Sequence, residues 1–352
     1  MGFKDFIDKF TGKKSTGSGG VFSSAMAIDL GTANTIIHQL DRGVILEEPS
    51  IIAIENDTKK VLAVGREAKA MLGRTGREIS VIQPLKDGVI KEATATMAML
   101  RQFFESTQTK RFSMRPRVLV CVPSRITEVE INAVRTSLER AGAREVLLVP
   151  EPLAAAVGVG LPIESAVGNM IVDIGGGTTE IVVISLNTIA ADSSIRVGGD
   201  EMNEAIVKYM KEYVNLLIGE QSAEAIKIQL GSLFENDTRE AEISGREISH
   251  GLPKTYNVKA SQIRSALREP VGKILQAVQL GLEKTPPELA RDIVNRGIVL
   301  TGGGALLRGL DVQLSKETQL PVRIADNPLS CTVLGAGIIL SDLYRYQKLL
   351  IK

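Results

Sequence analysis

The feature that most constrains the fold is a motif that occurs twice in the chain. The segment MAIDLGTANTII spans residues 26–37, and MIVDIGGGTTEIVV spans residues 170–183. In each, an apolar strand ends at an Asp, a glycine-containing turn with Thr follows, and a second apolar run comes next. The two starts lie 144 residues apart (170 minus 26), close to the length of one domain. Two related halves predict a bilobed protein with a cleft, whereas chance similarity of two glycine-turn hairpins would imply no such relationship.

Composition limits the kinds of protein that such a chain can be. Its 352 residues are 44% hydrophobic and 24% charged, which suits about two folded domains and excludes wholesale disorder. A net charge of +1 and an aromatic content of 4% argue against nucleic acid as a partner, because they disfavour a broad basic surface and a base-stacking platform. Two cysteines, Cys121 and Cys331, and two histidines, His38 and His250, leave little material for a zinc site or a disulfide framework.

Strands that alternate with amphipathic helices predict an α/β fold with a mainly parallel sheet. Thr127 and Glu130 have the spacing of a capping box, and Gly142 supplies a stop signal. A helix is therefore expected from Thr127 to Gly142. A second helix is expected at 94–106. Short strands are expected at 26–30, 35–40, 44–46, 51–54, 118–122 and 146–149.

Both copies of the repeated motif have the residues of a phosphate-binding turn. Glycines let the backbone approach an anion closely, and Gly31 and 175–177 meet that need. Asp29 and Asp173 each end a buried strand, where a carboxylate is costly unless it holds a cation or water. Magnesium suits such a place because it keeps most of its waters. The alternative is two ordinary Asp-Gly turns without a ligand.

Seven motifs occur in the order found in the actin-like ATPases, and more narrowly in the MreB family of bacterial actins, which this chain resembles from about Ala25 to Lys352. They are DLGTAN (29–34), QPLKDGVI (83–90), PEPLAAAVG (150–158), DIGGGTTE (173–180), GGDEMN (198–203), EAIKIQLG (224–231) and LTGGGALLRGL (300–310). Each motif is weak alone, and none matches a Rossmann or Walker A pattern, but their order makes coincidence an unsatisfactory explanation.

The resemblance implies an α/β, actin-like bilobed fold of two ribonuclease-H-like lobes, each with an inserted smaller subdomain, and a nucleotide cleft between them. The first lobe would comprise residues 25–155, with 326–352 returning to it, and would carry a small subdomain at about 43–85. The second lobe would comprise 156–325, with a small subdomain at about 191–257.

The resemblance also implies ATP and Mg²⁺ in the cleft and assigns roles to individual residues. Asp29 and Asp173 would hold magnesium through water, Glu151 would position the attacking water, and Thr178 would assist it. A bland alternative for Glu151 is an acid favoured by the dipole at a helix start. The expected nucleotide contacts are Thr32, Ala33, Asn34, Gly175, Gly176, Gly177, Glu224, Lys227, Gly302, Gly303 and Gly304.

The family resemblance implies a protein that polymerises with itself and helps to maintain rod shape. It would work in the cytoplasm, on the inner face of the membrane, with cell-shape and cell-wall synthesis membrane proteins as partners. A non-polymerising ATPase of the kinase or chaperone type shares the phosphate loops and remains the alternative. On the helix after Thr127, Val129 lies about 160° from the apolar face at 100° per residue, which suggests an exposed side chain. In this family the corresponding helix pairs antiparallel protofilaments, so Val129 is a candidate interface residue; the alternative is an incidental surface Val.

Two segments suggest contact with an anionic membrane surface. Residues 1–11 contain Phe3, Phe6, Ile7 and Phe10 on one helical face, and a Gly/Ser-rich linker at 12–24 follows. Docking of that helix on the protein's own core or on a partner is the alternative. Phe112 and Met114 are the apolar tips of a basic loop that could insert between anionic lipids, or simply lead into the next strand. The sequence has no apolar run of about 18 residues, the length that a membrane-spanning helix needs, and no secretory signal is evident.

Overall fold

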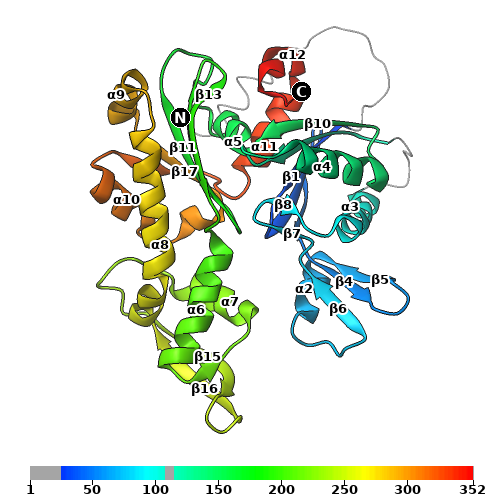
Figure 1. Ribbon diagram of the computed structural model, residues 1–352, viewed down its shortest axis with the longest axis vertical. Coiled ribbons are helices and arrows are strands. Elements are labelled where there is room, and N and C mark those ends of the chain that lie inside the picture. The colour runs from blue at the N-terminus through cyan, green and yellow to red at the C-terminus, as the bar shows by residue number, and fades with distance from the viewer. Residues whose placement is uncertain (1–24, 108–114, 352) are drawn as a thin grey trace.

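The computed structural model describes residues 25–107 and 115–351. Two five-stranded sheets form the centres of two lobes that lie side by side (Figure 1). In spatial order, the first sheet consists of β10 (Glu145–Pro150), β9 (Arg117–Val122), β1 (Ala25–Leu30), β2 (Asn34–Gln39) and β3 (Gly43–Pro49). The second consists of β13 (Thr188–Ile195), β12 (Thr179–Ser185), β11 (Asn169–Ile174), β17 (Ile298–Thr301) and β18 (Val322–Ile324).

The repeated sequence motif corresponds to a repeated topology. β1 pairs antiparallel with β2 and parallel with β9, and β11 pairs antiparallel with β12 and parallel with β17. Each motif Asp lies near the end of its strand, with Asp29 opposite Ile36 and Asp173 opposite Glu180. The two hairpins are therefore equivalent parts of two lobes, as the duplicated motif predicted.

A smaller sheet accompanies each lobe at the same end of the molecule (Figure 1). In the first lobe it has the order β5 (Val61–Val64), β4 (Ile52–Glu55), β6 (Ile79–Ile82), with α2 (Gly65–Met71) beside it. In the second lobe it has the order β14 (Leu216–Leu217), β15 (Glu240–Glu247), β16 (Pro253–Lys259), accompanied by α6 (Gly199–Tyr213) and α7 (Glu220–Leu230). A two-stranded hairpin of β7 (Leu85–Lys86) and β8 (Val89–Ile90) follows β6.

The expected boundaries of the small subdomains need correction. β3 lies within the range expected for the first of them, but it pairs with β2 in the large sheet, so the small sheet begins at Ile52. Similarly, the 191–195 segment belongs to β13, which pairs with β12 in the second large sheet. Periodicity identifies a strand but not its partner, which explains both errors.

Helices cover the two large sheets. On the first lobe these include α3 (Ala93–Thr107) and α4 (Glu128–Ala141). On the second lobe they include α8 (Ala260–Glu283), α9 (Pro287–Arg296) and α10 (Leu310–Thr318). The predicted capping box of α4 is present, because Thr127 Oγ1 accepts from the Glu130 N–H and Glu130 Oε2 accepts from the Thr127 N–H. The described residues contain no helix that is both long and apolar enough to cross a membrane.

Two central helices join the lobes. α5 (Glu151–Val159) leads from the first sheet to the second, and α11 (Cys331–Ser341) follows the chain's return from β18. They pack backbone to backbone: a Cβ on Gly335 would lie 1.8 Å from the carbonyl oxygen of Ala154, and one on Gly158 would lie 2.0 Å from that of Cys331. After α11 the chain ends in α12 (Leu343–Tyr346) and a 3₁₀ turn, η2 (Gln347–Leu349).

Candidate nucleotide-binding site

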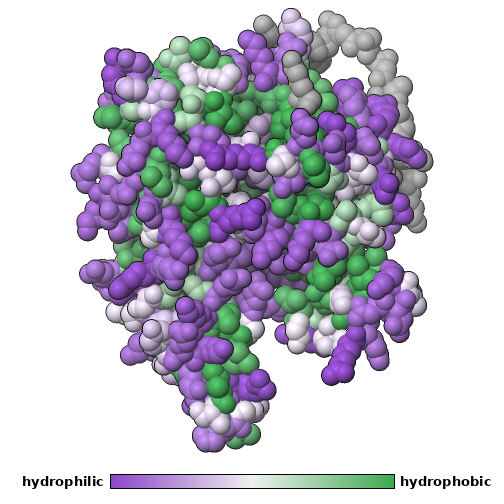
Figure 2. Space-filling model, in the orientation of Figure 1, coloured by the Kyte–Doolittle hydropathy of each residue, from purple (hydrophilic) through white to green (hydrophobic). Residues whose placement is uncertain are grey.

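A cavity of about 470 Å³ lies between the lobes and is lined by the turns of both repeated motifs. On the molecular surface, hydrophilic residues extend across the middle of one face, and the small subdomains form two separate projections at its lower end (Figure 2). Of the residues predicted to contact nucleotide or magnesium or to act in hydrolysis, those that line the cavity are Asp29, Thr32, Ala33, Asn34, Glu151, Asp173, Gly175, Gly176, Thr178, Glu224, Lys227, Gly302, Gly303 and Gly304.

The first turn, between β1 and β2, is held in place by a buried serine. Ser50 donates its hydroxyl to the Gly31 carbonyl oxygen at 2.7 Å, and its backbone N–H donates to that of Ala33 at 2.9 Å. Thr32 Oγ1 accepts from the Gly88 N–H at 2.9 Å, which connects this turn to the β7–β8 hairpin. These three hydrogen bonds hold the turn in position. Local sequence did not point to Ser50, which lies 19 residues after Gly31.

The second turn, between β11 and β12, closes on itself and touches the first. The Gly175 N–H donates to the Thr178 carbonyl oxygen at 2.9 Å. A Cβ on Gly176 would lie 2.8 Å from the Cβ of Ala33, so the two turns can meet only because Gly176 has no side chain. Gly177 is the one expected contact that does not line the cavity. It lies against Asp87, whose backbone nitrogen would be 3.0 Å from a Cβ added there.

Three carboxylates face the cavity and are otherwise surrounded by protein. Burial raises the pKa of Asp29 to about 7, with the Asp173 charge as a second cause. Burial also raises the pKa of Asp173 to about 6, and Thr332 Oγ1 donates to its Oδ2 at 3.5 Å. The pKa of Glu151 lies well above its usual range, because of burial and then of the Asp29 charge. A cation at this place would relieve the repulsion among these groups.

The charge distribution suits a cation held through water. Asp29 comes from the first lobe and Asp173 from the second. Within residues 25–107 and 115–351, no three or more His, Cys, Asp or Glu side chains are arranged to hold a metal ion directly. Mg²⁺ commonly uses one or two carboxylates and retains several waters, so two facing aspartates fit its requirements.

Glu151 is the first residue of α5 and follows Pro150, which ends β10. Glu151 is thus an acid at a helix start, where the dipole favours it, and it also lines the cavity. Pro150 and Pro152 restrict the backbone on either side. A carboxylate with a raised pKa in such a position can orient water or accept its proton. Thr178, from the second turn, lines the same cavity.

Glu224 and Lys227 lie one turn apart on α7 and both reach the cavity. Lys227 Nζ donates to the Gly199 carbonyl oxygen at 2.8 Å, and burial lowers the pKa of this amine. Glu224 forms an ion pair with Lys69 of α2, in the opposite lobe. The sequence motifs predicted a role for Glu224 and Lys227, but no motif near position 69 predicted that Lys69 would form an ion pair with Glu224.

The third glycine-rich segment follows β17 and forms the 3₁₀ turn η1 (Gly303–Leu306). Gly302 has φ of 77°, and a Cβ there would lie 2.5 Å from Asp173 Oδ1. Only glycine combines that backbone conformation with so close an approach to the carboxylate. Gly302 therefore lets this segment form one wall of the cavity beside Asp173.

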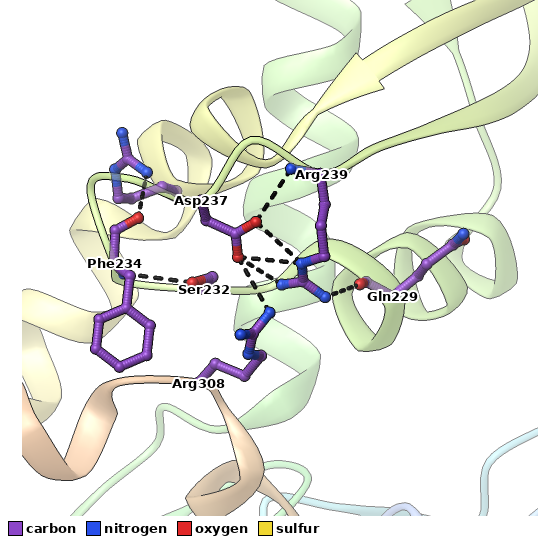
Figure 3. A network of polar contacts seen from close by, with 7 residues as sticks. Gln229, Ser232, Phe234, Asp237, Arg239 and Arg308 are labelled. Carbon is purple, nitrogen blue, oxygen red and sulfur yellow. Dashed lines mark hydrogen bonds and ion pairs between the residues drawn. The ribbon is translucent and has the colours of Figure 1, made fainter.

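A network of polar contacts adjoins that wall and includes Arg308, which lines the cavity (Figure 3). The carboxylate of Asp237, 6% exposed, lies between two guanidinium groups, with Oδ2 2.7 Å from Arg239 and 3.2 Å from Arg308. Arg308 also lines the cavity, and its carbonyl oxygen accepts from the Leu233 N–H at 2.8 Å. The network therefore joins the segment after η1 to the loop that follows α7. No sequence motif had marked Asp237.

The predicted surface contacts differ in how far the structure describes them. Val129 is 79% exposed on α4, on the face turned away from the core, as its helical position predicted. Phe3, Phe6, Ile7, Phe10, Phe112 and Met114 lie outside the described residues, as does the 12–24 linker.

Comparison with known proteins identifies the family. The family model described as MreB/Mbl protein matches residues 23–348. The chain is 50% identical over 325 residues to the cell shape-determining protein MreB of Escherichia coli K12, covering 90% of this chain and 93% of that one. It is 46% identical over 330 residues to the cell shape-determining protein Mbl of Bacillus subtilis 168, covering 93% and 99%.

Solved structures agree with this assignment. MreB5 of Spiroplasma citri bound to AMPPNP superposes with a TM-score of 0.88 at 36% identity, covering 94% of this chain and 99% of that one. A subunit of the MamK double helical filament gives a TM-score of 0.75 at 20% identity, covering 90% and 99%, and shows likeness of fold alone. The predicted actin-like bilobed fold is confirmed, and the chain belongs to the MreB/Mbl family of bacterial actins.

Proposed function

We propose that this protein is an ATP-dependent, filament-forming actin that polymerises on the inner face of the cytoplasmic membrane and organises cell-wall synthesis to maintain rod shape. The observation that carries the proposal is the cavity between the lobes, where two glycine turns meet beside Asp29, Asp173 and Glu151. The names of the relatives from E. coli and B. subtilis, both cell shape-determining proteins, support the role in shape.

ATP with Mg²⁺ is the ligand that best fits this cavity. The S. citri relative was solved with AMPPNP and with ADP, which supports an adenine nucleotide here. Backbone N–H groups of the two turns would bind the phosphates, and Glu224 and Lys227 would lie near the ribose and adenine. Asp29 and Asp173 would hold Mg²⁺ through its waters.

Hydrolysis would depend on Glu151. Phosphoryl transfer requires mainly positioning and charge neutralisation, so the protein's task is to aim a water at the γ-phosphate. The Glu151 carboxylate faces the cavity from the start of α5, and its raised pKa favours proton acceptance from that water. Thr178 would assist from the second turn.

Self-association is proposed as homopolymerisation with antiparallel pairing of protofilaments. The filament from which the MamK subunit comes supports assembly of this fold into polymers. The exposed face of α4, with Val129 at its start, is the proposed contact between paired protofilaments. An apolar side chain that is 79% exposed on a helix is a suitable interface residue.

Membrane attachment is proposed through Phe3, Phe6, Ile7 and Phe10, supplemented by Phe112 and Met114. A single short amphipathic segment binds weakly, and polymerisation would multiply such weak contacts by avidity. Filaments should therefore bind anionic vesicles much more strongly than monomers. Cell-shape and cell-wall synthesis membrane proteins are the proposed partners, and nucleic acid is not.

The test is electron microscopy and sedimentation of the full chain with ATP and Mg²⁺, with and without vesicles of phosphatidylglycerol and phosphatidylethanolamine. We expect paired filaments on the vesicles with ATP, and neither filaments nor vesicle binding with EDTA. A Phe6→Glu/Phe10→Glu variant should still polymerise in solution but leave the vesicles bare. Hydrolysis without a pellet across a wide concentration range would instead favour a non-polymerising actin-fold ATPase.

A further inference from the structure

A buried carboxylate of the second lobe holds the backbone of the first. Glu180, on β12, is 2% exposed. Its Oε1 and Oε2 accept from the Ser124 N–H at 3.0 and 3.3 Å, and its Oε1 accepts from the Ser124 hydroxyl at 3.2 Å. Among the described residues, Glu180 has no ion-pair partner. A buried carboxylate is costly without donors, so Ser124 is the main compensation for its burial.

The next residue makes a second contact between the same lobes. Arg125 Nε lies 2.5 Å from Asp192 Oδ2, and its terminal nitrogen donates to Asp192 Oδ1 at 3.2 Å and to the Asp192 carbonyl oxygen at 2.9 Å. Asp192 lies on β13, the strand next to β12. We call Ser124, Arg125, Glu180 and Asp192 the interlobe clasp. Two attachments at neighbouring positions fix the orientation of the loop as well as its distance from the second lobe.

The strand register places the interlobe clasp beside the catalytic side chains. β9, which leads into Ser124, lies between β1 and β10, and its Cys121 pairs with Asp29 while its Val122 pairs with Pro150, the residue before Glu151. On the other lobe, Glu180 pairs with Asp173 across β11 and β12. On each lobe, the strand that carries or leads into the clasp therefore pairs directly with the strand that carries or leads into a carboxylate facing the cavity.

We propose that the interlobe clasp sets the separation of the two lobes across the cleft, with Glu180 as a positioning residue for ATP hydrolysis. It acts through Ser124 on the strand between Asp29 and Glu151, and through its own strand on Asp173. The inference rests on the proposed ATPase function. It assigns to Glu180 no contact with nucleotide, and Glu180 does not line the cavity.

The first test compares variants at Glu180. Because misplacement of reacting groups by about 1 Å can cost roughly 100-fold in rate, Glu180→Ala should slow single-turnover hydrolysis by about 10- to 100-fold. The dissociation constant for a fluorescent ATP analogue should stay within about threefold, since the nucleotide contacts remain. Glu180→Gln keeps an acceptor for the Ser124 N–H and should retain most of the rate. Ser124→Ala removes only the hydroxyl donor and keeps the backbone N–H, so it should slow hydrolysis less than Glu180→Ala does.

The second test uses the exposed half of the clasp, which is less prone to folding failure. Arg125→Asp and Asp192→Arg should each slow single-turnover hydrolysis by about fivefold, the equivalent of about 1 kcal/mol for an exposed ion pair. The Arg125→Asp/Asp192→Arg double variant should restore the rate, because it restores the pair with reversed charges. Failure of that double variant to recover would overturn the proposal.

A distance measurement separates this proposal from the proposed function. Both native cysteines, Cys121 and Cys331, are buried, so spin labels can be directed to exposed Lys60→Cys and Leu252→Cys in the two small subdomains. With Mg²⁺ and a non-hydrolysable ATP analogue bound, at protein concentrations too low for polymerisation, Glu180→Ala should broaden the distance distribution between labels in monomers. A slowed Glu180→Ala protein with an unchanged distribution would show a direct chemical role and refute positioning. Lack of hydrolysis by the unmodified chain would refute the ATPase function and leave the distance result interpretable.

Discussion

Lys69 and Glu224 join the two small subdomains by an ion pair, with 2.5 Å between Lys69 Nζ and Glu224 Oε2. The Gln221 side chain also donates to the Lys69 carbonyl oxygen, so α2 and α7 touch at two points. Glu224 is at the same time a wall of the cavity and a proposed ribose contact. The bridge between the lobes and the proposed ribose contact therefore share one carboxylate.

Loss of this bridge should speed nucleotide exchange. Both side chains are about one-third exposed, so the pair is worth roughly 0.5–1 kcal/mol. We expect Lys69→Ala to raise the dissociation rate of a fluorescent ATP analogue by about two- to fivefold in stopped-flow measurements, with little effect on single-turnover hydrolysis. Lys69→Arg should preserve the slow rate, and Lys91→Ala, at an exposed position elsewhere in the first lobe, should resemble the unmodified protein.

Removal of the Glu151 carboxylate should separate binding from chemistry. Glu151→Ala is expected to keep nucleotide affinity within about threefold but to lower phosphate release by about 100- to 10,000-fold, the usual range for a proton-accepting group. Glu151→Gln can still orient water, so its rate of phosphate release should lie between those of the unmodified protein and Glu151→Ala. A phosphate-release assay with calorimetric binding tests this, and unchanged hydrolysis would remove Glu151 from the mechanism.

The facing aspartates make the stability of the nucleotide-free protein depend on pH. The pKa is about 7 for Asp29 and about 6 for Asp173 in the folded state, and about 4 for an Asp in the unfolded chain. Between about pH 4 and pH 7 the folded protein therefore binds more protons than the unfolded chain does. Its free energy of unfolding should therefore fall as pH rises from about 4 to 7, by about 1 kcal/mol or more per pH unit. Denaturant unfolding in EDTA measures the slope.

Asp29→Asn should flatten that dependence, since an amide needs no proton to remain neutral. At pH 8 it should raise the free energy of unfolding while weakening binding of ATP in the presence of Mg²⁺. The exposed Asp57→Asn is a matched control and should leave both properties unchanged. A steeper fall of stability with pH in Asp29→Asn would contradict the assignment of this carboxylate.

The crossing of α5 and α11 should tolerate no side chain. Gly335→Ala would place Cβ 1.8 Å from the Ala154 carbonyl oxygen, where backbone rather than a flexible side chain must move. We expect a loss of about 2–4 kcal/mol in the free energy of unfolding. Gly272→Ala in α8 is the control, because nothing lies within 4 Å of its added Cβ, and it should gain roughly 0.5–1 kcal/mol from helix propensity.

Val129→Glu should disrupt the pairing of protofilaments without affecting the fold. The side chain is 79% exposed, so the change in thermal midpoint should be within about 2 °C. Electron microscopy should then show single rather than double filaments with ATP. Val312→Glu, at an exposed position on α10, should leave pairing intact. Double filaments formed by Val129→Glu would exclude this residue from the interface.

Local patterns predicted the parts of the structure that are local in the chain. Alternating apolar strands around Asp29 and Asp173 gave both hairpins, and the spacing of Thr127 and Glu130 gave the start of α4. Contacts made across long separations had no such signal. Asp237 meets Arg308 from 71 residues away, and its neighbours in sequence resemble those of any surface turn. The turns of the candidate site could thus be predicted from the sequence, but the long-range contacts that hold the walls of the cavity together could not.

The chain passes between the lobes twice, once after α5 and once before α11, and the two helices are in backbone contact at that place. A body joined to another at two neighbouring points can rotate about the line through them but cannot swivel about either one. Opening of the cleft would therefore be a rotation about this line, opposed by the interlobe clasp and by the ion pair between Lys69 and Glu224. A filament built from such subunits could change its curvature in a defined direction, because every subunit would bend about the same axis.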